Sequence, residues 1–75
     1  MSNRLKNIGI NIKKLRKLKH LSQIELAVAV GIDRAYLSEI ENGRTNVSIN
    51  ILYAIADSLE LSIVDLLAEN KDEAR

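Results

Sequence analysis

The chain has 75 residues, enough for one small domain, and its formal net charge at pH 7 is only +1. It has no cysteine, which excludes a disulfide framework and a thiolate metal site, and it has no proline. No apolar run approaches the about 18 residues of a membrane span and no signal-peptide pattern is present, so we expect a cytoplasmic protein without a cofactor or metal ion.

The charges are distributed unevenly along the chain. Residues 1–20 carry seven basic side chains and no acidic one, whereas residues 57–75 carry six acidic side chains and two basic ones. Residues 1–20 can therefore attract a polyanion such as nucleic acid, although the net charge of the whole chain is close to zero. A solvated charged surface is the alternative that charge by itself leaves open. A membrane-surface role is disfavoured, because the apolar face of the basic segment is needed for the core.

The first predicted helix covers about residues 5–19. Apolar residues recur there at spacings of three and four, which gives one apolar face: Leu5, Ile8, Ile12 and Leu15. Gly9 lowers helix propensity by about 1 kcal/mol relative to alanine, so we interpret it as a point of close packing. His20 follows the helix. Because no second histidine exists to share a site, we interpret it as an exposed residue.

Residues 22–41 predict two short helices joined by a tight turn at Gly31. Glycine adopts the positive φ of such a corner without a Cβ clash. An S-x-x-E capping box at Ser22 begins the first of these helices. Asp33 is a good N-cap for the second, which we expect to end before Gly43.

Two further helices follow a polar loop over residues 43–47. Ser48 caps a helix that reaches about residue 59, with four inward residues: Leu52, Ile55, Ala56 and Leu59. Ser62 begins a fifth helix through a second capping pattern with Asp65. The charged residues 71–75 are expected to fray. No segment reads as a strand, so the expected fold is all-α: one compact five-helix domain over residues 1–75, ordered over about 5–70.

The second helix of the central pair has two different faces. At 100° per residue, Asp33, Leu37 and Ile40 fall on the buried side, and small or polar residues fall opposite. A helix with such a face fits the major groove of DNA, which is about 12 Å wide. Its side chains can contact base edges, thymine methyl groups or the groove edge. The predicted base or groove contacts are Arg34, Ala35, Tyr36 and Ser38.

Residues at the start of the preceding helix and in the loop after residue 42 are placed to contact phosphate. They are Ser22, Gln23, Arg44, Thr45 and Asn46. Glu39 does not fit, because a carboxylate repels phosphate; it is tolerable if it accepts from cytosine N4 or is held by an arginine. We interpret Arg16 and Glu41 as a structural ion pair that fixes this helix, rather than as DNA contacts.

Other interpretations of the central pair are weaker or less specific. Two helices joined by a glycine turn are also ordinary packing, so geometry by itself leaves a structural role open. An enzyme is disfavoured. Ser22, His20 and Asp33 are the only triad-like set, and neighbours at a helix junction do not align a nucleophile, a base and an orienting acid.

These residues resemble the helix-turn-helix of the Cro/phage-repressor (Xre) family. That family places a glutamine, a small alanine, a turn glycine and two apolar anchors at the positions of Gln23, Ala27, Gly31, Leu37 and Ile40. The resemblance covers about residues 8–67. It implies a lambda-repressor-like five-helix domain and a DNA-binding transcriptional regulator that is usually dimeric.

A narrower resemblance is to the controller proteins of restriction–modification systems. The run D-R-A-Y-L-S-E-I-E at residues 33–41 and the loop R-T-N-V-S-I at residues 44–49 are similar to theirs. Val47 stands where many other Xre members have proline, which favours the controllers. Ala35 departs from them, because controllers more often carry threonine there. The resemblance implies the same base contacts, with Gln23, Arg44 and Asn46 on the DNA backbone.

A helix-turn-helix unit usually reads two half-sites about 34 Å apart, which requires a two-fold dimer. The fifth helix carries more apolar surface than one short helix needs, from Ile63, Val64, Leu66 and Leu67. The predicted dimer interface is Ile63, Val64 and Leu67, and the alternative is that all four residues are core. We therefore predict a homodimer that binds a near-palindromic operator.

RNA polymerase is a further candidate partner, through Glu39 or Asp57. The other hypothesis is an antitoxin or partner-regulated repressor that acts mainly through a protein partner.

Overall fold

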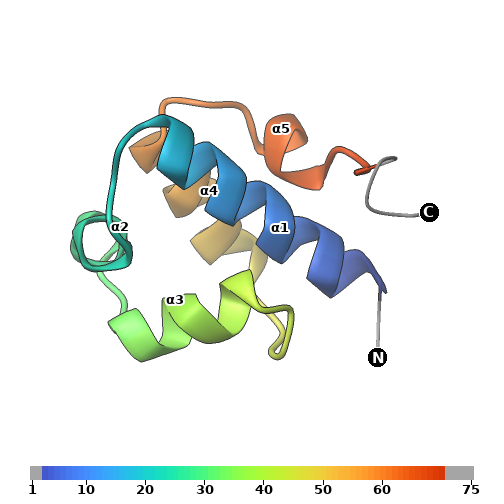
Figure 1. Ribbon diagram of the computed structural model, residues 1–75, viewed down its shortest axis with the longest axis horizontal. Helices are drawn as coiled ribbons and strands as arrows, with labels where there is room; N and C mark the ends of the chain where they lie inside the picture. The colour runs from blue at the N-terminus through green and yellow to red at the C-terminus, as the bar shows by residue number, and fades with distance from the viewer. Residues whose placement is uncertain (1–2, 71–75) are drawn as a thin grey trace.

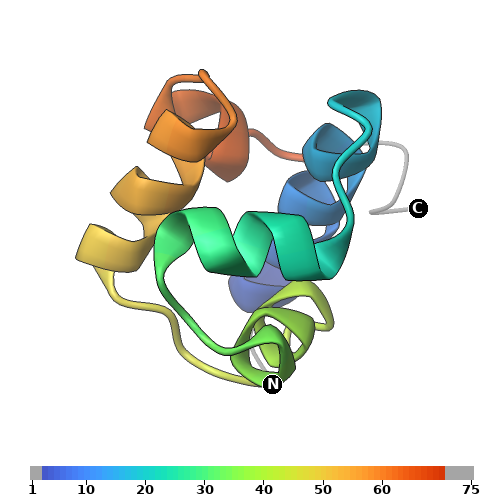
Figure 2. The ribbon, with the colours of Figure 1, turned by 90° about the vertical axis from the view of Figure 1, so that its left-hand side faces the viewer.

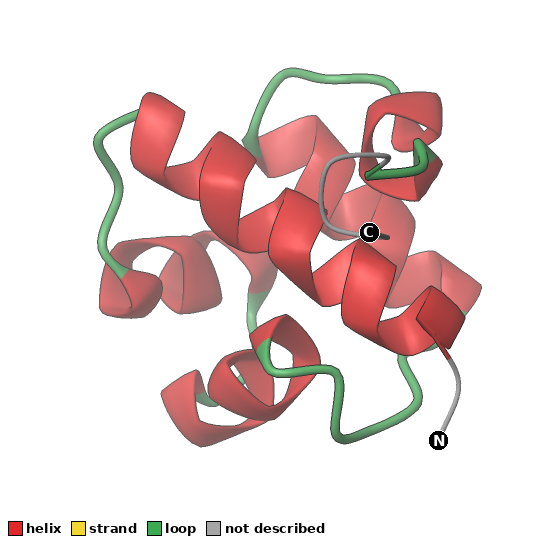
Figure 3. Cartoon of the chain, turned by 45° about the vertical axis from the view of Figure 1, so that its right-hand side comes forward, coloured by secondary structure: helices red, strands yellow, loops and turns green. Residues whose placement is uncertain are grey.

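The computed structural model describes residues 3–70, which form five helices and no strand (Figures 1 and 3). The helices are α1 (Asn3–Leu18), α2 (Gln23–Val30), α3 (Arg34–Glu41), α4 (Ile49–Ser58) and α5 (Ile63–Leu67). The predicted all-α, five-helix fold is confirmed, and the helix ends lie within two residues of those expected. The expected frayed tail, residues 71–75, lies outside the described residues.

Serine caps begin three of the helices. The Ser22 hydroxyl accepts from the Glu25 backbone N–H (3.0 Å), and the Glu25 carboxylate accepts from the Ser22 N–H (2.8 Å). Ser62 forms the same kind of capping box before α5, and Ser48 caps α4. These bonds satisfy backbone donors that a helix leaves free at its start, so the caps place the helix boundaries.

Asp33 differs from its expected role. It occupies the N-cap position of α3, but its side chain makes no capping bond, and it is exposed rather than buried. The residue precedes the first helical residue, so the 100° progression along α3 does not apply to it. An unpaired carboxylate is also costly to bury, which favours its exposure.

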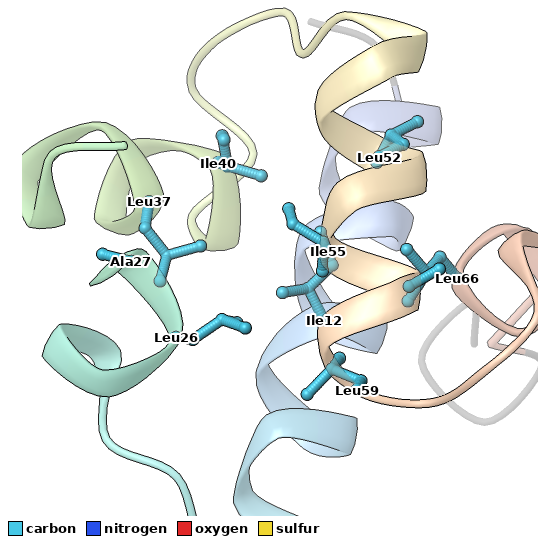
Figure 4. Packing of buried hydrophobic residues seen from close by; sticks show 10 residues of the cluster. Ile12, Leu26, Ala27, Leu37, Ile40, Leu52, Ile55, Leu59 and Leu66 are labelled. Atoms are coloured by element: carbon cyan, nitrogen blue, oxygen red, sulfur yellow. The ribbon is translucent and has the colours of Figure 1, made fainter. Parts of the chain in front are cut away.

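Each of the five helices contributes side chains to one hydrophobic core (Figure 4). The buried apolar residues are Ile12, Leu26, Ala27, Leu37, Ile40, Leu52, Ile55, Ala56, Leu59 and Leu66. The four residues that we expected to point inward from the fourth helix are all among them; three lie in α4, and Leu59 is its C-cap residue. Figure 4 shows Ile12 and Ile55 meeting between α1 and α4, with Leu26 and Leu37 facing them from α2 and α3.

Two glycines set how α3 lies against its neighbours. Gly31 ends α2 with φ 85°, and its N–H donates to the Ala27 and Val28 carbonyls. Figure 2 shows the result: α2 is seen from the side and α3 nearly end-on, so the two axes cross steeply. Gly9 lies directly against the end of α3, because a Cβ there would be 2.5 Å from the Ile40 carbonyl oxygen.

Candidate nucleic-acid interface

Helix α3 has one buried face and one exposed face. Leu37 and Ile40 are 0% and 2% exposed and anchor the helix in the core. Arg34 and Ala35 are exposed, and Ser38 is half-buried on the same outward side. α3 packs against α1 and α2 and lies along one edge of the molecule (Figure 1). The outward residues are therefore accessible to a large partner.

A buried ion pair fixes the C-terminal end of α3. Arg16 Nε lies 2.7 Å from Glu41 Oε2, and Arg16 Nη2 donates to Glu41 Oε1 at 3.0 Å. The two side chains are 7% and 1% exposed. The third guanidinium nitrogen of Arg16 donates to the Leu21 carbonyl at 2.8 Å. This two-point contact holds α3 to α1 in one orientation.

Gln23 extends this contact towards the surface. Its amide Nε2 donates to Glu41 Oε1 at 3.0 Å, and its Oε1 accepts from Arg34 at 3.4 Å. A continuous chain of polar contacts therefore runs from the buried ion pair to an exposed arginine. Gln23 is predicted from the sequence only as a phosphate contact, so its bridging position was missed. The spacing along the chain carries no signal for it, because Gln23 and Glu41 are 18 residues apart.

Glu39 is held by an arginine. Its carboxylate lies 3.5 Å from Arg44 Nη1, and the Arg44 backbone N–H donates to the Glu39 carbonyl at 3.0 Å. Both side chains are largely solvent-exposed, so the pair adds little stability. It does neutralise a negative charge on the side of α3 where that charge repels phosphate. A contact with an arginine is one of the two conditions under which a carboxylate at position 39 is compatible with a DNA-facing surface.

The loop after α3 is bonded back to the helix. The Tyr36 hydroxyl lies 3.4 Å from the Asn46 carbonyl, and Asn42 donates to the Ser38 carbonyl at 2.9 Å. Tyr36 is half-buried and packs against the core, so only part of it faces outward. Thr45 also donates to the Asn46 carbonyl, at 3.4 Å. The loop therefore keeps a defined position beside α3.

The serine and glutamine at the start of α2 lie beside this surface. Ser22 is exposed and its hydroxyl oxygen accepts the capping bond, which leaves its hydrogen free to donate. Arg44 and Asn46 are exposed in the loop that follows the C-terminal end of α3. The predicted phosphate contacts therefore lie at the start of α2 and in the loop after α3.

A second exposed surface lies on α5. Leu66 is fully buried and Ile63 is half-buried, but Val64 is 67% and Leu67 is 45% exposed. The alternative that all the apolar residues of α5 are core is therefore wrong. The helix has only five residues and cannot turn both sides inward. None of the helices among residues 3–70 is long and apolar enough to cross a membrane.

A family model described as helix-turn-helix matches residues 12–66. The antitoxin PezA of Streptococcus pneumoniae is 45% identical over 64 residues; the match covers 85% of this chain and 40% of PezA. This chain spans between 40% and 64% of the length of PezA and of two curated relatives from Bacillus phage phi105.

Two solved structures are closely similar. The restriction-modification controller protein C.AhdI from Aeromonas hydrophila has a TM-score of 0.84 and 34% identity, with 87% of this chain and 98% of that chain covered. SinR, a master regulator for biofilm formation that was solved in complex with DNA, has a TM-score of 0.75 and 44% identity, with 81% and 98% covered. The five helices, the steep α2–α3 corner and these matches agree: this chain belongs to the helix-turn-helix family of DNA-binding transcription regulators, in its Xre-type branch.

Proposed function

We propose that this chain binds a near-palindromic DNA operator in the cytoplasm as a homodimer, with α3 in the major groove. The observation that carries the proposal is the contrast between the two faces of α3. Its buried face is fixed by core residues and by the Arg16–Glu41 ion pair, while small and polar residues remain accessible on the other face. A rigid helix with such a face is what major-groove readout requires.

Base readout is assigned to the outward residues of α3, namely Arg34, Ala35, Tyr36 and Ser38. Arg34 is exposed, and its contact with Gln23 holds it near the start of the helix. From there a guanidinium can donate to guanine O6 and N7. Ala35 is small enough to approach a thymine methyl group, and the Ser38 hydroxyl can donate or accept.

Phosphate contacts are assigned to residues at the start of α2 and in the loop after α3. They are Ser22, Gln23, Arg44, Thr45 and Asn46. Contacts to the two strands on either side of the groove set the position of α3 and carry no sequence information of their own. The Arg44 guanidinium has five N–H donors, so its contact with Glu39 through Nη1 leaves donors for a phosphate.

The dimer contact is assigned to α5, through Ile63, Val64 and Leu67. The two exposed side chains among them supply apolar surface that a partner can cover. Half-sites about 34 Å apart are one turn of DNA. One protomer measures 33 × 22 × 20 Å, so two copies related by a two-fold axis can span that distance.

The regulator is assigned to a restriction–modification system, as its controller. The similarity to C.AhdI over nearly all of that protein supports this assignment. Activation requires a contact with RNA polymerase, for which Glu39 and Asp57 are the candidate residues. The alternative is an antitoxin that acts through a protein partner, which the similarity to part of PezA supports.

A gel-shift experiment with DNA from directly upstream of the gene tests the proposal. The intact protein should bind at moderate salt, and Arg34→Ala should bind much more weakly. Lys19→Ala is the matched control, because it also removes one exposed positive charge but lies after α1. Light scattering of the free protein tests the dimer. Failure of the intact protein to shift this DNA, or a monomer at high concentration, would contradict the proposal.

A further inference from the structure

Three asparagine side chains join α1 to the segment that follows α5. Asn7 and Asn11 lie one turn apart on α1, and Asn70 lies beside them. The side-chain amide of Asn70 donates to Oδ1 of Asn7 at 2.8 Å and to Oδ1 of Asn11 at 2.6 Å. Its backbone N–H also donates to Asn7, at 2.8 Å. We call these three residues the asparagine clasp.

The clasp also caps the C-terminal end of α5. The last carbonyl groups of a helix have no partner within the helix. Here Asn11 Nδ2 donates to the carbonyls of Leu66 (2.8 Å) and Ala68 (2.7 Å), and Asn7 Nδ2 donates to that of Ala68 (2.8 Å). A five-residue helix is not stable by itself in water. Its ordered end therefore depends on side chains from α1.

The clasp and the core contact hold α5 from one side. Leu66 is 0% exposed and is its core anchor, and Asn11 is itself buried. Val64 and Leu67 remain exposed. Figure 1 shows α5 and the following segment lying beside α1, so the contact joins the two ends of the described chain. The direction in which the exposed residues point is thus set by Leu66 and the clasp together.

We infer that the asparagine clasp positions the dimer surface. It sets the orientation of α5, and through α5 the orientation of Val64 and Leu67 towards a second copy of this chain. The inference rests on the homodimer proposed above. The asparagines act through α5 and do not themselves contact the partner, so they are positioning residues. Without the clasp, α5 must be ordered at the moment of association, and that ordering weakens dimerisation.

Two clasp variants test the inference: Asn70→Ala and Asn11→Ala. Sedimentation equilibrium gives the dimer dissociation constant, and thermal melting followed by circular dichroism gives the stability. Both variants should raise the dissociation constant at least about tenfold, because α5 must then be ordered on association in both protomers of the dimer. The side chain of Asn70 lies outside the core cluster. Asn70→Ala therefore tests whether the clasp affects dimerisation even if Asn11→Ala does not fold.

Val30→Ala is the matched control, because it removes apolar contact at a half-buried position of α2 without touching the clasp. If Val30→Ala lowers the melting temperature as much as Asn70→Ala does, it should still leave the dimer dissociation constant within about twofold of the wild type. Equal dimerisation of Asn70→Ala and the wild type would overturn the inference, as would equal weakening by Val30→Ala. A monomeric wild type would overturn the proposed homodimer itself, which is a distinguishable result.

Discussion

The buried ion pair between Arg16 and Glu41 gives the sharpest stability prediction. In Arg16→Ala the Glu41 carboxylate, with its side chain 1% exposed, keeps only the Gln23 amide as a side-chain partner among residues 3–70. Breaking a buried pair from one side costs about 3–5 kcal/mol, because a charge is left unpaired. At about 0.05–0.15 kcal/mol per residue, a domain of this length has a total stability of about 4–11 kcal/mol. The variant should therefore lose a large part of its stability.

The replacement of both partners separates the cost of the unpaired charge from the value of the pair. Arg16→Met combined with Glu41→Leu removes both charges and keeps similar volumes, so its stability should return to within about 1–2 kcal/mol of the wild type. Urea unfolding followed by circular dichroism measures each free energy.

Arg44→Ala is the control for the ion-pair experiment, because it breaks an exposed ion pair between α3 and the loop after it and should change the stability by less than about 1 kcal/mol. A loss below about 1 kcal/mol in Arg16→Ala would refute the reasoning. So would a double variant that is no more stable than the single one.

Three further predictions concern the contacts around α3. Gly9→Ala should lower the melting temperature in a calorimetric scan, because the new Cβ would lie 2.5 Å from the Ile40 carbonyl oxygen. Alanine favours helix formation more than glycine does, so a higher melting temperature would contradict this prediction. Gln23→Glu should destabilise the protein in urea more than Gln23→Ala at pH 7, since it places a second carboxylate 3.0 Å from Glu41; equal losses would argue against the bridge. Arg44→Ala should flatten the salt dependence of DNA binding by roughly one phosphate contact per protomer, because one exposed cation is lost from the interface; an unchanged slope in fluorescence anisotropy would show that Arg44 does not bind phosphate.

Features that depend on a few neighbouring residues could be predicted from the sequence. The Ser22 and Ser62 capping boxes each join residues three apart, and the glycine turn at Gly31 requires only its own backbone conformation. The buried residues of α4 also follow from a spacing within one helix. In these cases the physical cause and the pattern lie in the same short segment.

Contacts between distant segments were harder to predict. The Arg16–Glu41 ion pair was inferred only because both helices had already been placed by their patterns. The asparagine clasp joins residues about 60 positions apart, and nothing near Asn7 or Asn11 indicates its partner. The bridging position of Gln23 was missed for the same reason. Amide side chains accept and donate in many geometries, so their partners depend on the tertiary fold.

The most direct test of the central claim is the affinity ratio between the operator and a scrambled duplex of equal length. Fluorescence anisotropy at fixed salt would be measured for the wild type, Arg34→Ala and Lys19→Ala. A bidentate arginine–guanine contact gives about 1–3 kcal/mol of discrimination, and a dimer has two such contacts. The account predicts that Arg34→Ala lowers the ratio at least about 30-fold and that Lys19→Ala leaves it nearly unchanged. An unchanged ratio in Arg34→Ala would contradict the assignment of α3 as the helix that reads DNA.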